Sequence, residues 1–471
     1  MHKPLKKLSE ELRSGTISSV ELTKYYLEEI NKRNGELNAF VNFGKETEKN
    51  ALEMAKHADS IIKNGEGNEL TGIPLGLKDV FCEKGMETTA CSNILKGFKP
   101  PYEGTIVARL RKMGAVFIGH TNTDEFTMGA STETSCYGTT HNPHDLKRTS
   151  GGSSGGSAAG VAAGLCAWAL GTDTGGSIRQ PAAYCGVTGL KVTYGRTSRY
   201  GVMSMASSLD TIGCLTQTPE DAAIVLKHIA GHDEMDGTTP KVDVPDYSTL
   251  LGTKDLKGIR IGLPKEYLGM GLKDGVRKNF EHSIEQARQM GAEIKEISLP
   301  MTEHGLAVYY IICPSEVSAN MARYDGLRFG PTSDAKNLVE SYFEARTKGF
   351  GDEVKRRIMI GTYALSAGYY DAYYRKAQRV RTLTLREFDQ AFKEFDVLLT
   401  PTTPHVAFEC GSLSDPVQMY LEDVMTLPAS IAGIPAISVP NGKIDGMPTG
   451  LQIMGPHFGE GQILKVAQAL S

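Results

Sequence analysis

The sequence predicts an α/β protein with a central β-sheet that helices largely cover. From Gly72 onwards, short apolar runs alternate with amphipathic helical segments. The runs are nearly continuous in apolar residues, which is typical of strands that are buried on both faces. Alternation of helices with such strands favours a layered α/β architecture.

The first sixty residues are predicted to be helical. Ser18 and Glu21 have the spacing of a capping box, in which each side chain bonds a free backbone N–H group at the start of a helix. Leu22 and Tyr26 follow at helical spacing. A second helix is expected over roughly Lys45–Lys63, before the polar turn NGEGNE.

Further elements follow at short intervals along the chain. Helices are predicted over Thr105–Met113 and Ser157–Gly164, and along the face marked by Val276, Phe280, Ile284 and Ala287. Strands are predicted over Ala115–Gly119, Leu165–Leu170, Ile259–Leu263, Glu293–Ile297, Val397–Leu399, Ala436–Val439 and Leu451–Met454.

A polar segment at 233–254, with prolines at 240 and 245, is the candidate break in the domain. It could be a linker or a surface excursion. Catalytic motifs precede it and predicted strands follow it. We therefore expect one domain over 1–471, with the helical region 1–65 packed on its core and a surface excursion at 233–254.

Composition points to a soluble protein of a reducing compartment. The net charge of −4 leaves no electrostatic footprint for nucleic acid or an anionic membrane. None of the eight cysteines forms a CxxC pair, so we expect reduced thiols. The longest apolar stretch, Val161–Leu170, is too short to span a bilayer, and the N-terminus has no apolar core of a secretory signal. These features predict a cytoplasmic protein that does not contact membranes.

Two serines lie in glycine-rich loops between Gly151 and Pro181. Ser153 lies in GGSSGGS and Ser177 in GTDTGGS. Upstream, Lys78 follows the apolar run in GIPLGLKD. Neither loop contains a histidine, so the pattern suggests a nucleophile system that does not use histidine.

Ser177 is predicted to lie just before the N-terminus of a helix. Pro181 follows closely, and proline is favoured in a first helical turn because no backbone donor is lost there. The free N–H groups of the preceding turn would then converge near Ser177; they belong to Thr174, Gly175, Gly176 and Ser177 itself. Such donors suit a developing oxyanion, and losing one costs about 3 kcal/mol in a transition state.

Lys78 is the candidate base for a serine nucleophile. An ordinary lysine pKa of about 10.4 would keep it protonated at neutral pH. Burial would lower that pKa by several units, because desolvation disfavours the cation. The apolar neighbours that would bury it are Ile73, Leu75, Leu77 and Val80. Ser153 is then the natural relay, accepting a proton from Ser177 and donating its own to Lys78.

Each of these features has a commoner structural explanation when it stands alone. GGSSGG by itself is more often a flexible turn, and a lysine after an apolar run is most often a solvated strand end. The GxSxG match at Gly151–Gly155 would also fit an α/β-hydrolase esterase, for which His405 and His457 are available downstream. The combination within about one hundred residues favours the lysine-based site.

At these residues the chain resembles the amidase signature family. That signature joins GGSSGGS to a run of the form G-[ST]-D-x-G-G-S-[IV]-R-x-P, with a lysine in G-[IVL]-K-D upstream, and all three are present. The resemblance implies the amidase signature fold, with a central mixed β-sheet covered by helices on both faces. It also implies a triad with Ser177 as nucleophile, Ser153 as relay and Lys78 as base, and a cis peptide bond next to Ser153.

Within that family the chain most resembles the A subunits of tRNA-dependent glutamine amidotransferases. The stretches that carry this resemblance are NTDEFTMGASTETS (122–135), SIRQPAAYCGVTGLKVTYGRTSRYGV (177–202), the ASSLD run ending at Asp210, and RRIMIGTYALSAGYYDAYYRKAQRVR (356–381). The resemblance implies glutamine hydrolysis through an acyl-enzyme and delivery of ammonia through a tunnel. It implies a heterotrimer with B and C subunits, in which the B subunit makes the main contacts to tRNA.

The resemblance also bears on cofactors and on glutamine recognition. It implies no cofactor in this chain, with ATP and Mg²⁺ on the partner subunit that amidates Glu-tRNA(Gln). It assigns Arg357 to the α-carboxylate of glutamine, with Arg356 a near-equal candidate, and Asp423 to the α-ammonium. Tyr309 and the turn Met128–Gly129–Ala130 are expected to line the pocket.

The chain departs from the family pattern in two places. Ser150 precedes GGSSGG where proline is common, which should change the stiffness of the loop more than its chemistry. The chain ends at Ser471, where relatives commonly carry a further helix.

Three other functions remain open on the sequence: a stand-alone amidase for small amides, the esterase, and a non-enzymatic assembly subunit. Intact Lys78, Ser153 and Ser177 argue against the last. The histidines in HNPH (141–144) are expected to belong to a loop rather than a metal site, since no acidic or cysteine cluster completes them.

Overall fold

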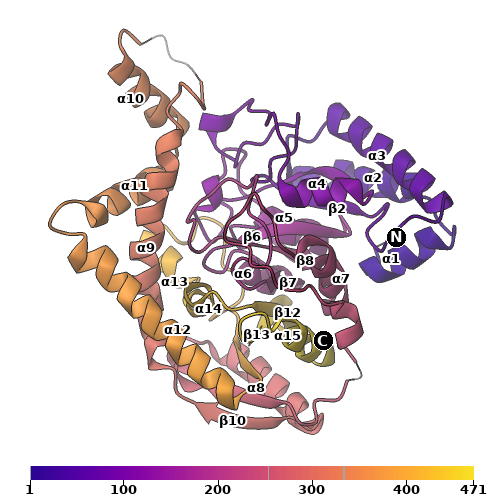
Figure 1. The fold of residues 1–471 in the computed structure, drawn as a ribbon, viewed down its shortest axis with the longest axis vertical. Coiled ribbons are helices and arrows are strands. Elements are labelled where there is room, and N and C mark those ends of the chain that lie inside the picture. Colours follow the sequence, from indigo (N-terminus) through magenta and orange to yellow (C-terminus); the bar gives the residue numbers. More distant parts are fainter. Residues whose placement is uncertain (1, 253, 332–334) are drawn as a thin grey trace.

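The computed structural model describes residues 2–252, 254–331 and 335–471, and a large central sheet organises them (Figure 1). Among these residues, eleven strands form one sheet in the order β1-β3-β2-β6-β8-β7-β12-β13-β11-β9-β10. Their bounds are β1 Phe40–Val41, β2 Pro74–Lys78, β3 Val116–Thr121, β6 Trp168–Asp173, β7 Thr188–Lys191, β8 Thr211–Thr216, β9 Arg260–Pro264, β10 Glu293–Ile297, β11 Val397–Pro401, β12 Ala436–Ile444 and β13 Met447–Met454. A separate hairpin joins β4 His141–Asn142 to β5 Asp145–Thr149.

The sheet is mixed, as the resemblance implied. β2 pairs in parallel with β3 and β6, and β9 pairs in parallel with β10 and β11. The strands between these two groups, from β6 through β8, β7, β12 and β13 to β11, pair antiparallel.

Helices cover both faces of this sheet. α5 and α6 contact one face, and α7 and α15 contact the other. The helices are α1 Leu5–Arg13, α2 Ser19–Leu37, α3 Lys45–Lys63, α4 Thr105–Lys112, α5 Gly155–Ala162, α6 Arg179–Cys185, α7 Pro219–Ile229, α8 Asp274–Gln289, α9 Gly305–Asn320, α10 Leu338–Gly349, α11 Asp352–Leu365, α12 Lys376–Glu394, α13 Pro416–Leu421, α14 Leu427–Ala432 and α15 Glu460–Ala469. The predicted α/β class is confirmed.

The N-terminal helices form as the sequence predicts. Ser18 caps α2 and forms the full capping box with Glu21. Leu22, Tyr26 and Ile30 are buried in the main hydrophobic cluster, and α3 covers the predicted range Lys45–Lys63. Lys6 N also donates to Asp221 Oδ1 at 3.0 Å, which ties α1 to α7.

Three strands around the site were not predicted as strands: β2, β7 and β8. All three contain glycine, and β7 and β8 also contain threonine, which weakens the pattern of a buried strand. The strand predicted over Leu165–Leu170 lies further along, as β6 at Trp168–Asp173, so it ends directly before the turn that carries Ser177.

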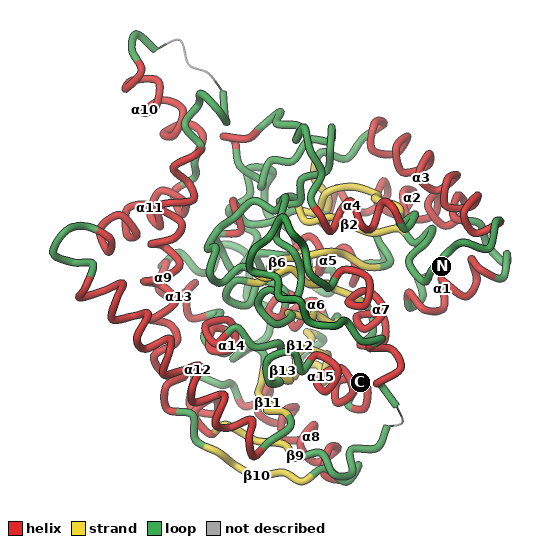
Figure 2. The backbone as a smooth tube through the Cα atoms, in the orientation of Figure 1, coloured by secondary structure: helices red, strands yellow, loops and turns green. Residues whose placement is uncertain are grey.

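A long helical excursion, α9 to α12, connects β10 to β11 and extends to the left of the sheet in Figure 1. α9 packs closely on α11, because Gly361 lets the helices approach until an added Cβ would lie 1.8 Å from the carbonyl oxygen of Pro314. The tube in Figure 2 shows how this helical part differs from the loop-rich centre. The close approach fixes α9 and α11 relative to each other.

The polar segment 233–254 runs along the surface and, apart from Thr253, lies within the described residues. Asp233 accepts a hydrogen bond from Thr105 at 2.6 Å, and Arg196 bonds the carbonyl of Asp243 at 2.8 Å and the ring hydroxyl of the buried Tyr247. All eight cysteines are free thiols. In the described ranges, no helix is both long and apolar enough to cross a membrane.

Candidate active site

Lys78 lies at the end of β2 and is completely buried. Its Nζ atom donates to three hydroxyl oxygens: Ser153 Oγ at 2.8 Å, Ser154 Oγ at 2.9 Å and Thr172 Oγ1 at 2.9 Å. The three N–H donors of an ammonium group are thus all satisfied. The structure brings the predicted base and the predicted relay into direct contact.

Burial lowers the pKa of Lys78 to about 7, because the buried cation loses its hydration. The charges of Asp124, Asp173 and Asp210 oppose this effect, in that order. The lowered pKa agrees with the direction that the sequence predicts. Near neutral pH, Lys78 can therefore exist as a neutral amine.

A neutral Lys78 has a lone pair, so one of its three hydroxyl partners must donate to it. The hydroxyl of Ser154 already donates to the carbonyl of Thr172 at 3.2 Å. Within the described part of the chain, the hydroxyl protons of Ser153 and Thr172 have no such acceptor. Ser153 is therefore free to pass a proton to Lys78.

Ser153 lies in a tight loop before α5. The peptide bond between Gly152 and Ser153 is cis, as the resemblance implied. Gly152 cannot carry a side chain, since an added Cβ would lie 2.2 Å from Asp124 Oδ2. Ser154 N donates to the carbonyl of Ser177 at 3.0 Å, so the two serine loops are hydrogen-bonded to each other.

Ser177 lies two residues before α6, close to the predicted position at a helix N-terminus. The residue is buried but retains 5% exposure, whereas Lys78 and Ser153 have none. Within the described residues its hydroxyl forms no hydrogen bond, so the structure leaves the link from Ser177 to Ser153 unmade. Hydrogen bonds at catalytic groups are often long or absent before substrate binds.

The turn 174–177 presents unused backbone donors. In the described part of the chain, the N–H groups of these four residues make no hydrogen bond. Gly176 has a φ of 158°, and a Cβ there would lie 2.1 Å from Thr426 Oγ1. The turn therefore needs glycine, and it leaves four donors available for an oxyanion.

Buried ionic and hydrogen bonds hold this turn on both sides. Asp173 pairs with Arg179 at 2.9 Å, and neither side chain is exposed. Burial raises the pKa of Asp173, but the charge and hydrogen bonds of Arg179 outweigh burial and lower it. Thr174 donates to Asp210 at 2.7 Å. Sequence reasoning assigned no role to this bracing.

Asp423 and Tyr309, predicted to bind glutamine, lie against the same turn. A Cβ on Gly176 would lie 3.1 Å from Asp423 Oδ1, and one on Gly175 would lie 3.0 Å from the Tyr309 hydroxyl. Among the described residues, Asp423 Oδ1 is buried without a hydrogen-bond partner. Burial raises the pKa of Asp423 well above its ordinary value. An unpartnered buried carboxyl group is suited to receive a cationic ligand.

Arg357, on α11, is buried beside the stacked rings of Tyr310 and Tyr420, with its guanidinium 5.4 Å from the first ring centroid and 5.6 Å from the second. Its Nε donates to Glu353 Oε1 at 2.8 Å, and Glu353 also accepts from the Tyr420 hydroxyl at 3.0 Å. Tyr310 in turn packs edge-on against Tyr309. This aromatic chain leads from Arg357 to the turn beside Ser177.

A cavity of about 210 Å³ lies beside Arg357. Gly129 and both candidate arginines line it, together with Glu353 and Tyr420. Arg356 also pairs with Glu353, but its side chain is 39% exposed, against 4% for Arg357. The cavity lining does not include the triad, Asp423 or Tyr309, so the predicted residues divide between this cavity and the buried turn.

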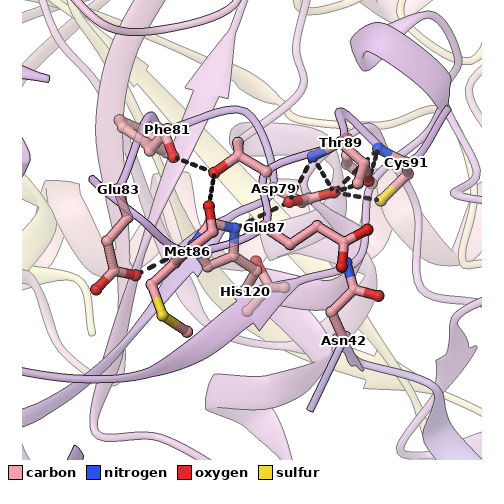
Figure 3. Close-up of polar contacts among 12 residues, drawn as sticks. Asn42, Asp79, Phe81, Glu83, Met86, Glu87, Thr89, Cys91 and His120 are labelled. Atoms are coloured by element: carbon pink, nitrogen blue, oxygen red, sulfur yellow. Dashed lines mark hydrogen bonds and ion pairs between the residues drawn. The ribbon is translucent and has the colours of Figure 1, made fainter. Parts of the chain in front are cut away.

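A second polar cluster surrounds His120 on β3 and includes Asp79, the residue after Lys78 (Figure 3). His120 Nδ1 contacts Asp79 Oδ1 at 2.9 Å, and Nε2 contacts Glu83 Oε2 at 3.2 Å. Burial lowers the pKa of His120, but the hydrogen bonds to Asp79 and Glu83 outweigh it and raise the pKa to about 9. Asp79 also accepts from Thr89 N, Thr89 Oγ1 and Cys91 N. The cluster anchors the chain directly after Lys78.

The histidines required by the esterase alternative have other partners. His405 contacts Glu422 at 3.1 Å and the carbonyl of Val406 at 2.9 Å, and His457 lies 3.9 Å from Asp389. Neither forms a hydrogen bond with Ser153 in the described part of the chain. The geometry gives no support to a histidine-based nucleophile at Ser153.

The two histidines of HNPH belong to the β4–β5 hairpin, in which His141 lies in β4 and only His144 lies in the loop. His144 contacts the carbonyl of Cys185 at 3.0 Å, and His141 contacts the thiol of Cys410 at 3.9 Å. Within the described ranges, no group of three or more His, Cys, Asp and Glu side chains could hold a metal ion.

Four residues that the sequence reasoning did not single out touch the predicted site. Ser154 and Thr172 contact Lys78, Asp124 contacts the Ser153 loop, and Glu353 contacts both arginines. Glu353 could have been found from its helical spacing to Arg357, which is four residues away. Ser154 and Thr172 lie inside the quoted motifs, but only the fold decides which hydroxyls face Lys78.

The chain is similar to known proteins over nearly all of its length. The family model described as Amidase matches residues 21–464. The glutamyl-tRNA(Gln) amidotransferase A subunit of Caldanaerobacter subterraneus subsp. tengcongensis is 52% identical over 464 residues, covering 98% of this chain and 94% of that protein. The protein of the same name from Nitrosococcus oceani is 52% identical over 468 residues, covering 99% and 96%.

Solved structures agree with this. The glutamyl-tRNA(Gln) amidotransferase A subunit of Thermotoga maritima superposes with a TM-score of 0.80 at 38% identity, covering 96% of this chain and 91% of that chain. The peptide amidase of Stenotrophomonas maltophilia superposes with a TM-score of 0.84 at 32% identity, covering 99% and 96%.

Proposed function

The chain belongs to the amidase family, and from that premise we propose that it is the glutamine-hydrolysing subunit of a tRNA-dependent amidotransferase. The observation that carries this proposal is 52% identity, over 98% of the chain, to a glutamyl-tRNA(Gln) amidotransferase A subunit. Identity to the peptide amidase is lower, at 32%.

In the proposed reaction, the Ser177 oxygen attacks the side-chain amide carbon of glutamine. Its proton passes to Ser153, while the Ser153 proton passes to neutral Lys78. The carbonyl oxygen becomes an oxyanion, which the N–H groups of 174–177 stabilise. The ammonium of Lys78 returns the proton through Ser153 to the leaving nitrogen, the C–N bond breaks and ammonia leaves. Water then hydrolyses the ester on Ser177 by the same proton path, releasing glutamate.

Substrate binding would complete the link that the structure leaves open. Ser153 is already bonded to Lys78 at 2.8 Å, and Ser177, at 5%, is the triad member that keeps some exposed surface. A bound amide beside the turn would exclude water and favour the hydrogen bond from Ser177 to Ser153. Lys78 would thus be held ready by its own three contacts before glutamine arrives.

Glutamine would be recognised at its charged end. Within the described residues the Nη atoms of Arg357 have no carboxylate partner, so they suit the α-carboxylate, while unpartnered Asp423 suits the α-ammonium. Tyr309 would close the pocket between Asp423 and Arg357. Gly129 would line the entrance through the cavity of about 210 Å³.

The remaining assignments concern the complex. The chain would act in the cytoplasm with B and C subunits, and the ammonia would reach the B subunit through a tunnel. That subunit would contact the tRNA and hold ATP and Mg²⁺ for the conversion of Glu-tRNA(Gln) to Gln-tRNA(Gln). A net charge of −4 on this chain agrees with tRNA contact through another subunit.

The test uses the chain co-expressed with the B and C subunits of its own organism. Release of glutamate and ammonia is measured with glutamine, asparagine and a simple aliphatic amide, and then conversion of Glu-tRNA(Gln) is measured with ATP. We expect glutamine to be the best amide and the tRNA product to require Ser177. Cleavage of simple amides without glutamine hydrolysis would overturn the proposal in favour of a stand-alone amidase.

A further inference from the structure

Asp124 is a fully buried carboxyl group that contacts two loops of the site. A Cβ atom added to Gly152, which lies in the Ser153 loop, would be 2.2 Å from Asp124 Oδ2. A Cβ on Gly129, at the cavity, would lie 2.4 Å from its Oδ1 atom. One carboxyl group therefore lies between the loop that holds the relay and the turn that lines the cavity.

Burial raises the pKa of Asp124, and its hydrogen bonds oppose this shift because they favour the ionised form. Oδ2 accepts from Thr132 N at 2.9 Å and from Ser131 N at 3.3 Å. Oδ1 accepts from Thr134 Oγ1 at 2.9 Å, and the same hydroxyl oxygen accepts from Glu125 N at 3.1 Å. The two backbone N–H groups can only donate, so a protonated carboxyl would find no acceptor for its hydrogen at Oδ2.

The charge of Asp124 is not neutralised nearby. In the described residues no cation lies within ion-pair distance of it, whereas Asp173 is paired with Arg179 at 2.9 Å. The groups whose charge raises the pKa of Lys78 are Asp124, Asp173, Asp210 and the Cys91 thiol, and Asp124 has the largest effect of the four. Burial raises the pKa of Asp210 to about 6 and holds the Cys91 thiol in its neutral form by raising its pKa. Asp124 is thus the unpaired charge with the largest effect on Lys78.

We propose that Asp124 is a positioning residue, which ties the Gly129 turn to the Ser153 loop and supplies the counter-charge for protonated Lys78. It touches neither substrate nor the reacting atoms and acts through Lys78 and Ser153. The proposal rests on the base role given to Lys78 in the proposed function. Removing the negative charge should make Lys78 easier to deprotonate.

The test follows the covalent labelling of Ser177 by a neutral fluorophosphonate against pH. The bond from Ser177 Oγ to phosphorus forms, the P–F bond breaks, fluoride leaves and the serine proton passes by Ser153 to Lys78. This readout needs no glutamine, so a failure to hydrolyse glutamine would count against the proposed function and leave this test intact. Lys78→Met should abolish the pH-dependent labelling; if it does not, the base role fails.

We expect Asp124→Asn to move the midpoint of the labelling curve down by roughly one pH unit and to lower the plateau rate several-fold. The matched control is Asp221→Asn, since Asp221 is also buried but lies on α7 and bonds Lys6 N. The labelling midpoint of Asp221→Asn should stay at the value of the parent protein. If Asp124→Asn is labelled more slowly but its labelling midpoint does not move, Asp124 has only a structural role. That result would overturn the proposal that it supplies the counter-charge for Lys78.

A second pair of variants covers the case in which Asp124→Asn does not fold. Thr134→Val removes the hydroxyl that donates to Asp124 at 2.9 Å, while Thr134→Ser keeps it. Losing this donor lets Asp124 take up a proton at higher pH. The Thr134→Val midpoint should shift in the same direction by a smaller amount, and Thr134→Ser should match the parent. If the parent protein, Thr134→Val and Thr134→Ser all share the same labelling midpoint, the proposal is contradicted.

Discussion

Lys78 and Ser153 are joined by a hydrogen bond of 2.8 Å, and neither side chain has any exposed surface. The third member of the proposed triad, Ser177, forms no hydrogen bond through its hydroxyl within the described residues. Base and relay are therefore preassembled in a buried cluster, whereas the nucleophile remains free at the edge of the site. This division explains how a lysine can be kept ready for proton transfer without being exposed to water.

Lys78→Met should nearly abolish amide hydrolysis. Methionine keeps most of the buried volume but removes the group that would accept the proton, and a general base typically contributes about 100-fold to 10,000-fold. We expect a loss of at least roughly 100-fold in kcat/KM for glutamine, with an unchanged circular dichroism spectrum. A loss of only a few-fold in a well-folded variant would exclude Lys78 as the base.

The labelling of Ser177 should rise with pH through a midpoint of about 7 and level off at higher pH. Burial lowers the pKa of Lys78 to about 7, and the base works in its neutral form, so activity is lost as pH falls through this value. Glutamine turnover is a less clean readout, because burial also raises the pKa of Asp423. A neutral fluorophosphonate, measured from pH 5.5 to 9, isolates Lys78. A rate that falls as pH rises would contradict the assignment.

Arg357→Lys should weaken glutamine binding much more than it slows the chemistry. Lysine keeps the charge but loses the fork that matches a carboxylate and the bond to Glu353 at 2.8 Å. We expect the KM for glutamine to rise about 30-fold, equivalent to ~2 kcal/mol, while Ser177 labelling stays close to the parent rate.

The control for this change is Arg356→Lys, which alters an arginine whose side chain is 39% exposed. It should change KM less than three-fold or so, as surface ion pairs contribute little. If Arg356→Lys gives the larger rise, the two arginines must exchange roles in the proposal.

The local parts of the fold could be predicted because their signals are local. The capping box of Ser18 and Glu21 identifies the start of α2, and the apolar face beginning at Val276 identifies α8. β7 and β8 escaped prediction because their sequences, TGLK and TIGCLT, carry too little periodicity. These strands acquire their place through pairing across the sheet, which a single segment does not encode.

The site divides in a similar way. Lys78, Ser153 and Ser177 stand out because glycine-rich loops and an apolar run surround them in the sequence. Asp124 and Asp173 do not stand out, because their importance depends on contacts with Gly152 and Arg179 that only the folded chain makes. Motifs thus identify the groups proposed to react. The groups that position them and set their electrostatic environment are recognised only in the tertiary structure.

His120 should stabilise the fold in a pH-dependent way. Both ring nitrogens face carboxylates, Asp79 at 2.9 Å and Glu83 at 3.2 Å, so the buried ring carries both protons. Its pKa is raised from 6.5 to about 9, because the two carboxylate bonds outweigh burial. A raised pKa means that the stabilisation is complete below about pH 6.5 and is lost as pH rises through about 9. It is worth about 3 kcal/mol at the lower pH.

His120→Gln should therefore lower the urea midpoint strongly at pH 6 and much less at pH 10. The parent protein should lose stability between these values, while the variant should change less over the same range. His282→Gln, at an exposed position on α8, is the control and should follow the parent curve. Equal losses for His120→Gln at both pH values would mean that packing, and not the charge on the ring, accounts for the contribution of His120.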